Sequence, residues 1–384
     1  MTYNVIGILI AVAVNGALTV LPAKLAKDKG CSFLAYWFLG FFLTFIICYM
    51  VVESLEDNRA PIGNWKPVNG YAKPVNPGNR DVPGFMLMGI FLLGALILGA
   101  TDNRFFRSEN INNVLEYQFG FYAAAALVTA LTIRSKGPDI SFVPLAVLAG
   151  FIIVSGDTYA GVAIAFGVCL LVGIVNGLIV TLTNMPAVIA TLVTGVLANL
   201  ATRLIFGGIK WTGIPVTRDL YPLPLIAAAI CVPLVFLTKL RLSKDRHLSG
   251  NSGSLRNRAF WRKNLAYIAA YAASATIACV SGFYLTARVG GASTKMGSDL
   301  YEVIALVFFA VSSVRLRHSK WSVVYALVPA FGWALLGNAM NLLNMPSYDQ
   351  MLLRAALLLA FSAVFFAGRV KRRNVKKQDQ ESVV

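Results

Sequence analysis

The sequence has little charge and few of the groups that enzymes use. Lys, Arg, Asp and Glu make up 13% of the 384 residues, against roughly a quarter in a soluble domain. The chain contains no Gly-x-x-x-x-Gly-Lys-Ser/Thr loop, no His-Glu-x-x-His pair and no Gly-x-Ser-x-Gly turn. The low charge argues against a soluble protein. The missing motifs exclude ATP hydrolysis of the P-loop kind, and we expect no enzyme activity.

Histidine and cysteine are also sparse. The only two histidines, His247 and His318, stand in basic stretches, so we predict no metal site and no cofactor. The cysteines have no Cys-x-x-Cys spacing and lie mostly inside apolar runs, so we expect buried free thiols. They are Cys31, Cys48, Cys169, Cys231 and Cys279.

Long apolar runs fill the chain instead. Hydrophobic residues make up 57% of it. All but the shorter run at 303–314 are about 16 to 24 residues long, and about 20 residues cross the hydrocarbon core as a helix. Membrane strands would alternate in polarity, whereas these runs are apolar on every face. The sequence predicts an all-α, polytopic transmembrane helical bundle with about twelve spans. The runs cover residues 4–22, 33–52, 84–100, 117–133, 140–155, 161–183, 187–206, 223–239, 264–286, 303–314, 321–343 and 350–367.

The net charge of +17 gathers in the connections between these runs. Residues 239–263 and 369–377 contain the two largest groups of Lys and Arg. Lys and Arg next to a span mark its cytoplasmic side, so we attribute the charge to membrane orientation rather than to nucleic-acid binding. With 239–263 inside, counting spans puts 287–302 and 344–349 outside. The N-terminal pair fits this count less well, and its topology stays open.

The tripeptide Asn-Met-Pro occurs twice, at 184–186 and at 344–346, each time between two apolar runs. Five spans separate the copies, which puts them on opposite faces of the membrane and predicts inverted repeats. Two inverted halves around a midplane site are the recurrent plan of transporters. The alternative is ordinary helix-start chemistry, because Pro is well tolerated in a first helical turn.

Four blocks resemble a known family in their order and spacing. They are "FFRSENINNVLEYQFGFYAAAALVTALTIRSKGPDIS", "GIVNGLIVTLTNMPAVIATLVTG", "HLSGNSGSLRNRAF" and "MNLLNMPSYDQMLLRAALLLAF". Across residues 105–368 the chain resembles the permease subunits of bacterial ABC importers of the ribose and simple-sugar type, including the autoinducer permeases. The resemblance implies about ten family spans, with about two extra spans at the N-terminus.

The resemblance also implies a function and partners. The chain would be the membrane-spanning permease subunit of an ABC transporter that imports a sugar or sugar-like solute across the bacterial inner membrane. Its partners would be a separate ATP-binding cassette subunit, a second permease subunit and an extracytoplasmic solute-binding protein. Alternatives are another solute (a nucleoside or a branched-chain amino acid), an ion-driven secondary transporter, or an integral membrane enzyme.

The chain departs from the family in several places. The glycine-rich run expected after the eighth family span is replaced by "AVSSVRLRHSK". The Asp-x-Ser pair is kept as Asp139 and Ser141, but the following glycine is Val143. The usual Arg-Gly in the fifth family span is Asn199-Leu200. Residues 1–83 have no recognised counterpart. We predict an extra membrane pair at 1–52, a Pro-rich linker at 53–83, the permease domain at 84–368 and a basic cytoplasmic tail at 369–384.

Two sets of candidate site residues follow. By resemblance, the turn of Leu248, Ser249, Gly250 and Asn251 starts the helix that couples to the ATPase, although a plain positive-inside loop is an alternative. Polar groups inside spans are costly unless they face a cavity or a partner helix. We therefore predict that the solute path includes Asn176, Asn199, Asn338 and Asn341. The competing role for these amides is hydrogen bonding between helices.

The acidic residues near the membrane lie at the ends of the runs, among them Asp139, Asp299 and Glu302. A proton or sodium relay needs a carboxylate deep in the bundle, so this placement argues against an ion-driven transporter. Glycines in "VGIVNGLIV" and "VSGFYL" are expected to allow close packing of helices.

Overall fold

A computed structural model describes most of the membrane region. The described residues are 14–28, 32–43, 48, 89, 94, 96–97, 99–156, 158–183, 185–211, 226–227, 229–231, 233–234, 258–311 and 322–363. Their contacts divide the chain into two compact units. One comprises Met1–Val82 with Pro186–Ile189, and the other comprises Pro83–Met185 with Ala190–Val384.

The described elements are almost all helices, as the sequence predicts. In chain order they are α2 (Val20–Asp28), α3 (Phe33–Leu43), α6 (Ser108–Asn113), the π-helix η1 (Val114–Phe119), α7 (Gly120–Ser135), α8 (Phe142–Ser155), α9 (Thr158–Leu182), α10 (Ala187–Phe206), β1 (Ile209–Trp211), α12 (Arg258–Val289), β2 (Gly291–Ser293), α13 (Leu300–Val311) and α15 (Ser322–Leu342). Residues 347–363 are also helical.

Among the described residues, four helices are long and apolar enough to cross a membrane: Tyr159–Leu182, Ala187–Phe206, Asn264–Val289 and Ser322–Leu342. Shorter apolar helices cover Gly120–Ser135, Phe142–Ser155 and Leu300–Val311. The apolar run at 187–206 matches α10 at both ends, whereas α13 begins three residues before its run. The runs at 4–22, 33–52, 84–100 and 223–239 lie partly or mostly outside the described residues. The expectation of an all-α membrane bundle is confirmed.

In the first unit, α2 and α3 pack against each other. Trp37 Nε1 donates to the carbonyl oxygen of Gly16 at 3.1 Å, and Cys48 Sγ donates to that of Tyr36 at 3.1 Å. Helix α2 extends to Asp28, beyond the expected end of the first apolar run at residue 22. Lys24 and Lys27 lie on its exposed side.

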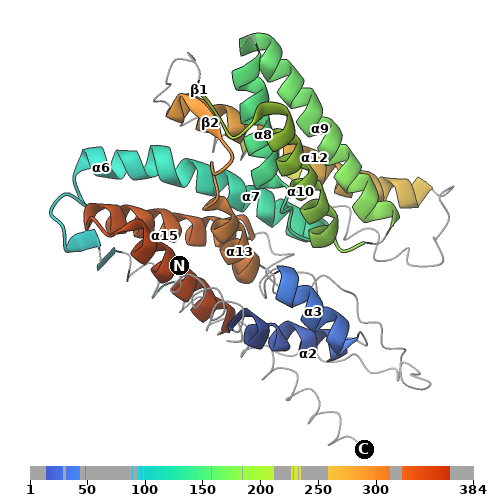
Figure 1. Ribbon diagram of the computed structural model, residues 1–384, viewed down its shortest axis with the longest axis horizontal. Coiled ribbons are helices and arrows are strands. Elements are labelled where there is room, and N and C mark those ends of the chain that lie inside the picture. The colour runs from blue at the N-terminus through green and yellow to red at the C-terminus, as the bar shows by residue number, and fades with distance from the viewer. Residues whose placement is uncertain are drawn as a thin grey trace, which may run out of the picture. The chain divides into compact units, whose positions relative to one another are not determined.

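In the second unit the helices form two neighbouring groups. In one group α12 packs along α8 and α9, and in the other α13 and α15 pack against α7 (Figure 1). α6, η1 and α7 follow one another without a break, so residues 108–135 form one long helical element. α7 also contacts α12 and thereby joins the two groups.

The close packing of α9 on α12 depends on glycine, as the sequence predicts. A Cβ added at Gly173 would lie 2.7 Å from the carbonyl oxygen of Tyr271, and one at Gly177 would lie 2.6 Å from the Cα of Ile268. Real side chains do not approach backbone atoms so closely. These two positions therefore fix how near the helices approach.

A short antiparallel ladder joins two distant connections. In it β1 pairs with β2, with Ile209 opposite Ser293 and Trp211 opposite Gly291. Counting spans from the basic stretch 239–263, which we expect to be cytoplasmic, predicts that both connections are extracytoplasmic. Their pairing at one end of the bundle agrees with that assignment.

Candidate functional site

The connection between α7 and α8 holds a buried polar cluster, the Asp139 cluster, made of Asp139, Ser141, Asn176, Thr194 and Ser274. One carboxylate oxygen of Asp139, Oδ1, accepts from Ser141 N at 2.9 Å and from Ser141 Oγ at 2.6 Å. The other, Oδ2, accepts from Ser274 Oγ at 2.6 Å. Asp139 is 1% exposed, and the two serines are buried as well. The Asp-x-Ser pair therefore binds the start of α8 to α12.

Asn176 extends the Asp139 cluster to α9 and α10. Its Nδ2 donates to Ser141 Oγ at 3.0 Å, and its Oδ1 accepts from Thr194 Oγ1 at 2.6 Å. The residue is fully buried. Because both ends of the amide have partners, this asparagine holds helices together in the structure, which is the alternative role that intramembrane amides have.

Burial raises the pKa of the Asp139 carboxyl, and the hydrogen bonds from Ser141 and Ser274 oppose this rise. Three donors on one carboxylate favour its ionised form, whereas the loss of water favours the neutral form. The position of Asp139 at the end of an apolar run does not predict that its side chain is almost completely buried. The acid belongs to a packed connection and not to a solvated loop.

The connection after α7 also binds two other helix ends. Lys136 Nζ donates to the carbonyl oxygen of Val180, in the last turn of α9, at 3.1 Å. Arg134, which directly follows the predicted run 117–133, is 2% exposed, and its Nη1 donates to Ser322 Oγ at the start of α15 at 2.9 Å. These contacts place the end of α9 and the start of α15 beside the C-terminal end of α7.

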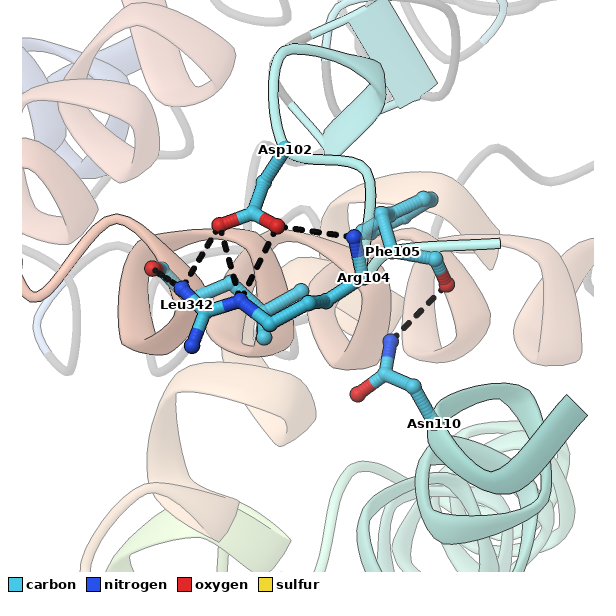
Figure 2. Close-up of polar contacts among 5 residues, drawn as sticks. All are labelled: Asp102, Arg104, Phe105, Asn110 and Leu342. Carbon is cyan, nitrogen blue, oxygen red and sulfur yellow. Dashed lines mark hydrogen bonds and ion pairs between the residues drawn. The ribbon is translucent and has the colours of Figure 1, made fainter. Parts of the chain in front are cut away.

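Arg104 lies just before the start of the long α6–η1–α7 element and binds the end of α15, the helix that leads into the second Asn-Met-Pro turn. Arg104 Nη2 donates to the carbonyl oxygen of Leu342, the last residue of α15, at 2.9 Å (Figure 2). Asp102 holds the guanidinium in place through an ion pair of 2.7 Å. The hydrogen bond from the Arg104 side chain lowers the pKa of Asp102 to about 2. Figure 2 also shows Asn110 Nδ2 donating to the carbonyl oxygen of Phe105.

A second polar group, the Glu302 cluster, lies where α13 begins and α15 ends. Its hydrogen-bonded members are Tyr122, Asp299, Glu302, Trp333 and Arg354. We also include Gln118, which lies with Arg354 beside Gly337, and Asn338, the residue that follows Gly337 in the chain. Glu302 Oε2 accepts from Trp333 Nε1 at 3.1 Å and from Arg354 Nη1 at 3.4 Å. Tyr122 OH donates to Asp299 Oδ2 at 2.6 Å. As the sequence suggests, Glu302 stands in the first turn of its helix, where the dipole favours a negative charge.

The four predicted path asparagines do not share one environment. Asn176 belongs to the Asp139 cluster, and Asn199 is half-buried on α10. Asn338 is 4% exposed in the Glu302 cluster, whereas the exposed Asn341 accepts from Gln350 Nε2 at 3.1 Å. The predicted coupling residues Leu248, Ser249, Gly250 and Asn251 lie outside the described residues.

Several polar residues of these clusters carry no motif and were missed by the sequence argument. Gln118 and Arg354 lie inside the predicted runs 117–133 and 350–367, so the rule applied to asparagine also selects them. Ser274 and Thr194 give no such signal, since hydroxyl side chains in apolar helices usually bond their own backbone.

The cysteines behave as small apolar residues in the part of the chain that the structure describes. Cys48, Cys169, Cys231 and Cys279 are free and buried, as predicted, while Cys31 lies outside that part. Among the described residues no group of three or more His, Cys, Asp or Glu side chains is placed to hold a metal ion.

Comparison with known proteins shows relatives over most of the chain. The ribose import permease protein RbsC of Escherichia coli (strain K12) is 28% identical over 292 residues, which cover 71% of this chain and 90% of that protein. RbsC of Haemophilus influenzae is 25% identical over 282 residues, or 68% of this chain and 87% of its own length. The autoinducer 2 import system permease protein LsrC of Yersinia pseudotuberculosis is 24% identical over 332 residues, or 78% and 89%. No family model matches the chain, and no solved structure matches it.

Proposed function

We infer that this chain, a divergent member of the family of ribose and autoinducer 2 import permeases, is the membrane-spanning permease subunit of an ABC importer. Its cargo is a sugar or a sugar-like small solute. The observation that carries the inference is the alignment with the ribose permease, which spans nearly the whole length of that relative. The long apolar helices supply the membrane-crossing elements that such a subunit needs.

The energy comes from a separate ATPase subunit. The chain itself lacks a P-loop, so it contributes a path and not the hydrolysis. In this proposal the turn Leu248 to Asn251 contacts the ATPase, a second permease subunit completes the path, and an extracytoplasmic binding protein delivers the solute. Access alternates between the two sides of the bacterial inner membrane as the ATPases close.

The path asparagines receive different roles in this proposal. Asn199, Asn338 and Asn341 are the candidates for direct contact with solute. Asn176 acts as a positioning residue, because both ends of its amide are bound to Ser141 and Thr194. The permease domain covers residues 84–368. Residues 1–52 form an added membrane pair, 53–83 a linker and 369–384 a cytoplasmic tail.

Two solutes are suggested by the names of the relatives, ribose and autoinducer 2. A direct test is uptake into proteoliposomes that contain this chain with its co-purifying ATPase and second permease subunit, in the presence of the solute-binding protein. Labelled ribose and autoinducer 2 are supplied in parallel, with and without ATP. We expect uptake of one of them to require ATP. Uptake that survives ATP depletion and collapses with the ion gradient would make the protein a secondary transporter.

A second experiment tests the coupling turn. Replacing Leu248 to Asn251 by a flexible neutral tetrapeptide should leave the protein inserted but abolish association with the ATPase. Undiminished association would refute the coupling assignment and would leave the permease function standing.

A further inference from the structure

The Glu302 cluster contains polar atoms that the protein buries without pairing them. In the described residues, Gln118 Oε1, Asn338 Nδ2 and Arg354 Nε are shielded from solvent and have no hydrogen-bond partner. An unpaired buried polar atom destabilises the folded state, so native proteins rarely keep several together without a use for them.

Two of these residues converge on one point of α15. Arg354 Nη2 lies 3.3 Å, and Gln118 Oε1 3.6 Å, from the position that a Cβ on Gly337 would take. The guanidinium and the amide therefore approach the same stretch of helix backbone from two different elements, and the missing side chain of Gly337 permits this. Asn338, with its unpaired donor, is the next residue of α15.

The chemistry of the group selects its ligand. Arg354 and Asn338 offer unpaired donors, and Gln118 offers an unpaired acceptor. A hydroxyl group both donates and accepts, so neighbouring hydroxyls of a polyol can satisfy such a mixed set. The charge of Arg354 is already balanced by Glu302, 3.4 Å away, which disfavours an added anion.

The location suits a solute that arrives from outside. α13 begins and α15 ends at this cluster. The charge pattern assigns the adjoining connections, 287–302 and 344–349, to the extracytoplasmic side. A solute that enters from outside would reach these residues before it reaches the interior of the bundle.

We propose that Gln118, Asn338 and Arg354 form an outward subsite for a neutral, hydroxyl-rich solute, with Glu302 and Trp333 holding the Arg354 guanidinium in place. The class of solute rests on the proposed function, whereas the location rests on the unpaired atoms. Asn338 is the one path asparagine that belongs to this subsite.

The test measures thermal unfolding of the purified full chain in lipid nanodiscs. The probes are D-ribose, ribitol and sodium phosphate, each added at increasing concentration. A ligand that binds only the folded protein raises the unfolding midpoint in a saturable way. We expect both polyols to raise the midpoint of the wild type and phosphate to leave it unchanged.

Two variants locate the effect. Gln118→Leu removes the unpaired acceptor at similar volume, so the protein without ligand should be as stable as the wild type or more so. Its apparent polyol affinity should fall by about tenfold, the value of one lost hydrogen bond. Asn264→Leu is the matched control, since Asn264 is also buried with an unpaired Nδ2 but stands near the start of α12. It should keep the full polyol shift.

Arg354→Lys provides a second probe of the site, because it keeps the charge and removes the Nε and Nη2 donors. It should weaken polyol binding as Gln118→Leu does. Equal polyol shifts in the wild type and both site variants would overturn the proposal. So would a wild type that responds to neither polyol, or one that responds to phosphate alone. Uptake without ATP dependence would instead contradict the proposed function and leave this binding result intact.

Discussion

Lys136 Nζ donates a hydrogen bond to the carbonyl oxygen of Val180, at the C-terminal end of α9. Just before the other end of the long α6–η1–α7 element, Arg104 Nη2 donates a hydrogen bond to the carbonyl oxygen of Leu342, at the C-terminal end of α15. The two helices that lead into the Asn-Met-Pro turns therefore end near opposite ends of one continuous helical element. This is the arrangement that inverted repeats require.

Each of these cations should stabilise the helix end that it binds. The last carbonyls of a helix lack partners within the helix and carry partial negative charge. Lys136→Met and Arg104→Met should each lower the unfolding midpoint relative to the wild type. Thermal unfolding in nanodiscs measures this. Lys295→Met, at an exposed lysine, is the control, and equal stability of all three variants would contradict the assigned role.

The approach of α9 to α12 gives a sharper stability prediction. Gly177→Ala places a Cβ against the Cα of Ile268, a backbone atom that cannot rotate away. We expect a loss of about 1 to 3 kcal/mol from overpacking. Gly167→Ala is the matched control on the same helix, because nothing lies within 4 Å of its added Cβ. Its stability should be unchanged or higher, and a loss equal to that of Gly177→Ala would count against the packing argument.

Asn176 and Asn199 should respond differently to truncation. Asn176→Ala breaks the bonds to Ser141 and Thr194 and should cost about 1 to 3 kcal/mol. Asn199→Ala should change stability by less than about 0.5 kcal/mol and lower solute uptake by folded protein. Unfolding midpoints and uptake per inserted molecule separate the two effects. Full stability of the Asn176→Ala protein would contradict the positioning role and would make Asn176 a candidate for contact with solute again.

Asp102 makes the wild type sensitive to acid in a defined range. Its pKa is lowered to about 2, chiefly by the hydrogen bond from the Arg104 side chain. A lowered carboxylate pKa stabilises the fold above the unfolded pKa of about 4, and this contribution disappears as the pH falls toward about 2. The unfolding midpoint of the wild type should exceed that of Asp102→Asn at neutral pH. The difference should vanish in this acidic range, and a difference that grows on acidification would contradict the ion pair.

The sequence predicts what depends on length and polarity, and it misses what depends on distant partners. The run at 187–206 coincides with α10 because a membrane helix is specified by its own apolar residues. The burial of Asp139 depends on Ser274, 135 positions away, and no local pattern links the two. Arg134 illustrates the same limit, since a basic residue after a span suggests a solvated flank until its partner Ser322 is known.

The Glu302 cluster combines both cases. Glu302 is predictable from its position in the first turn of a helix, and Asn338 from its polarity inside an apolar run. The convergence of Gln118 and Arg354 on Gly337 cannot be predicted in this way, because the two residues come from elements more than two hundred residues apart.

The inverted repeat requires the two Asn-Met-Pro turns to face opposite sides of the membrane, and cysteine labelling can measure this. Met185→Cys and Met345→Cys are made separately in a background without the five native cysteines. Each is then labelled with a membrane-impermeant maleimide in right-side-out and in inside-out vesicles. We expect position 345 to react only in right-side-out vesicles and position 185 only in inside-out ones. Reaction of both positions in the same kind of vesicle would contradict the inverted repeat.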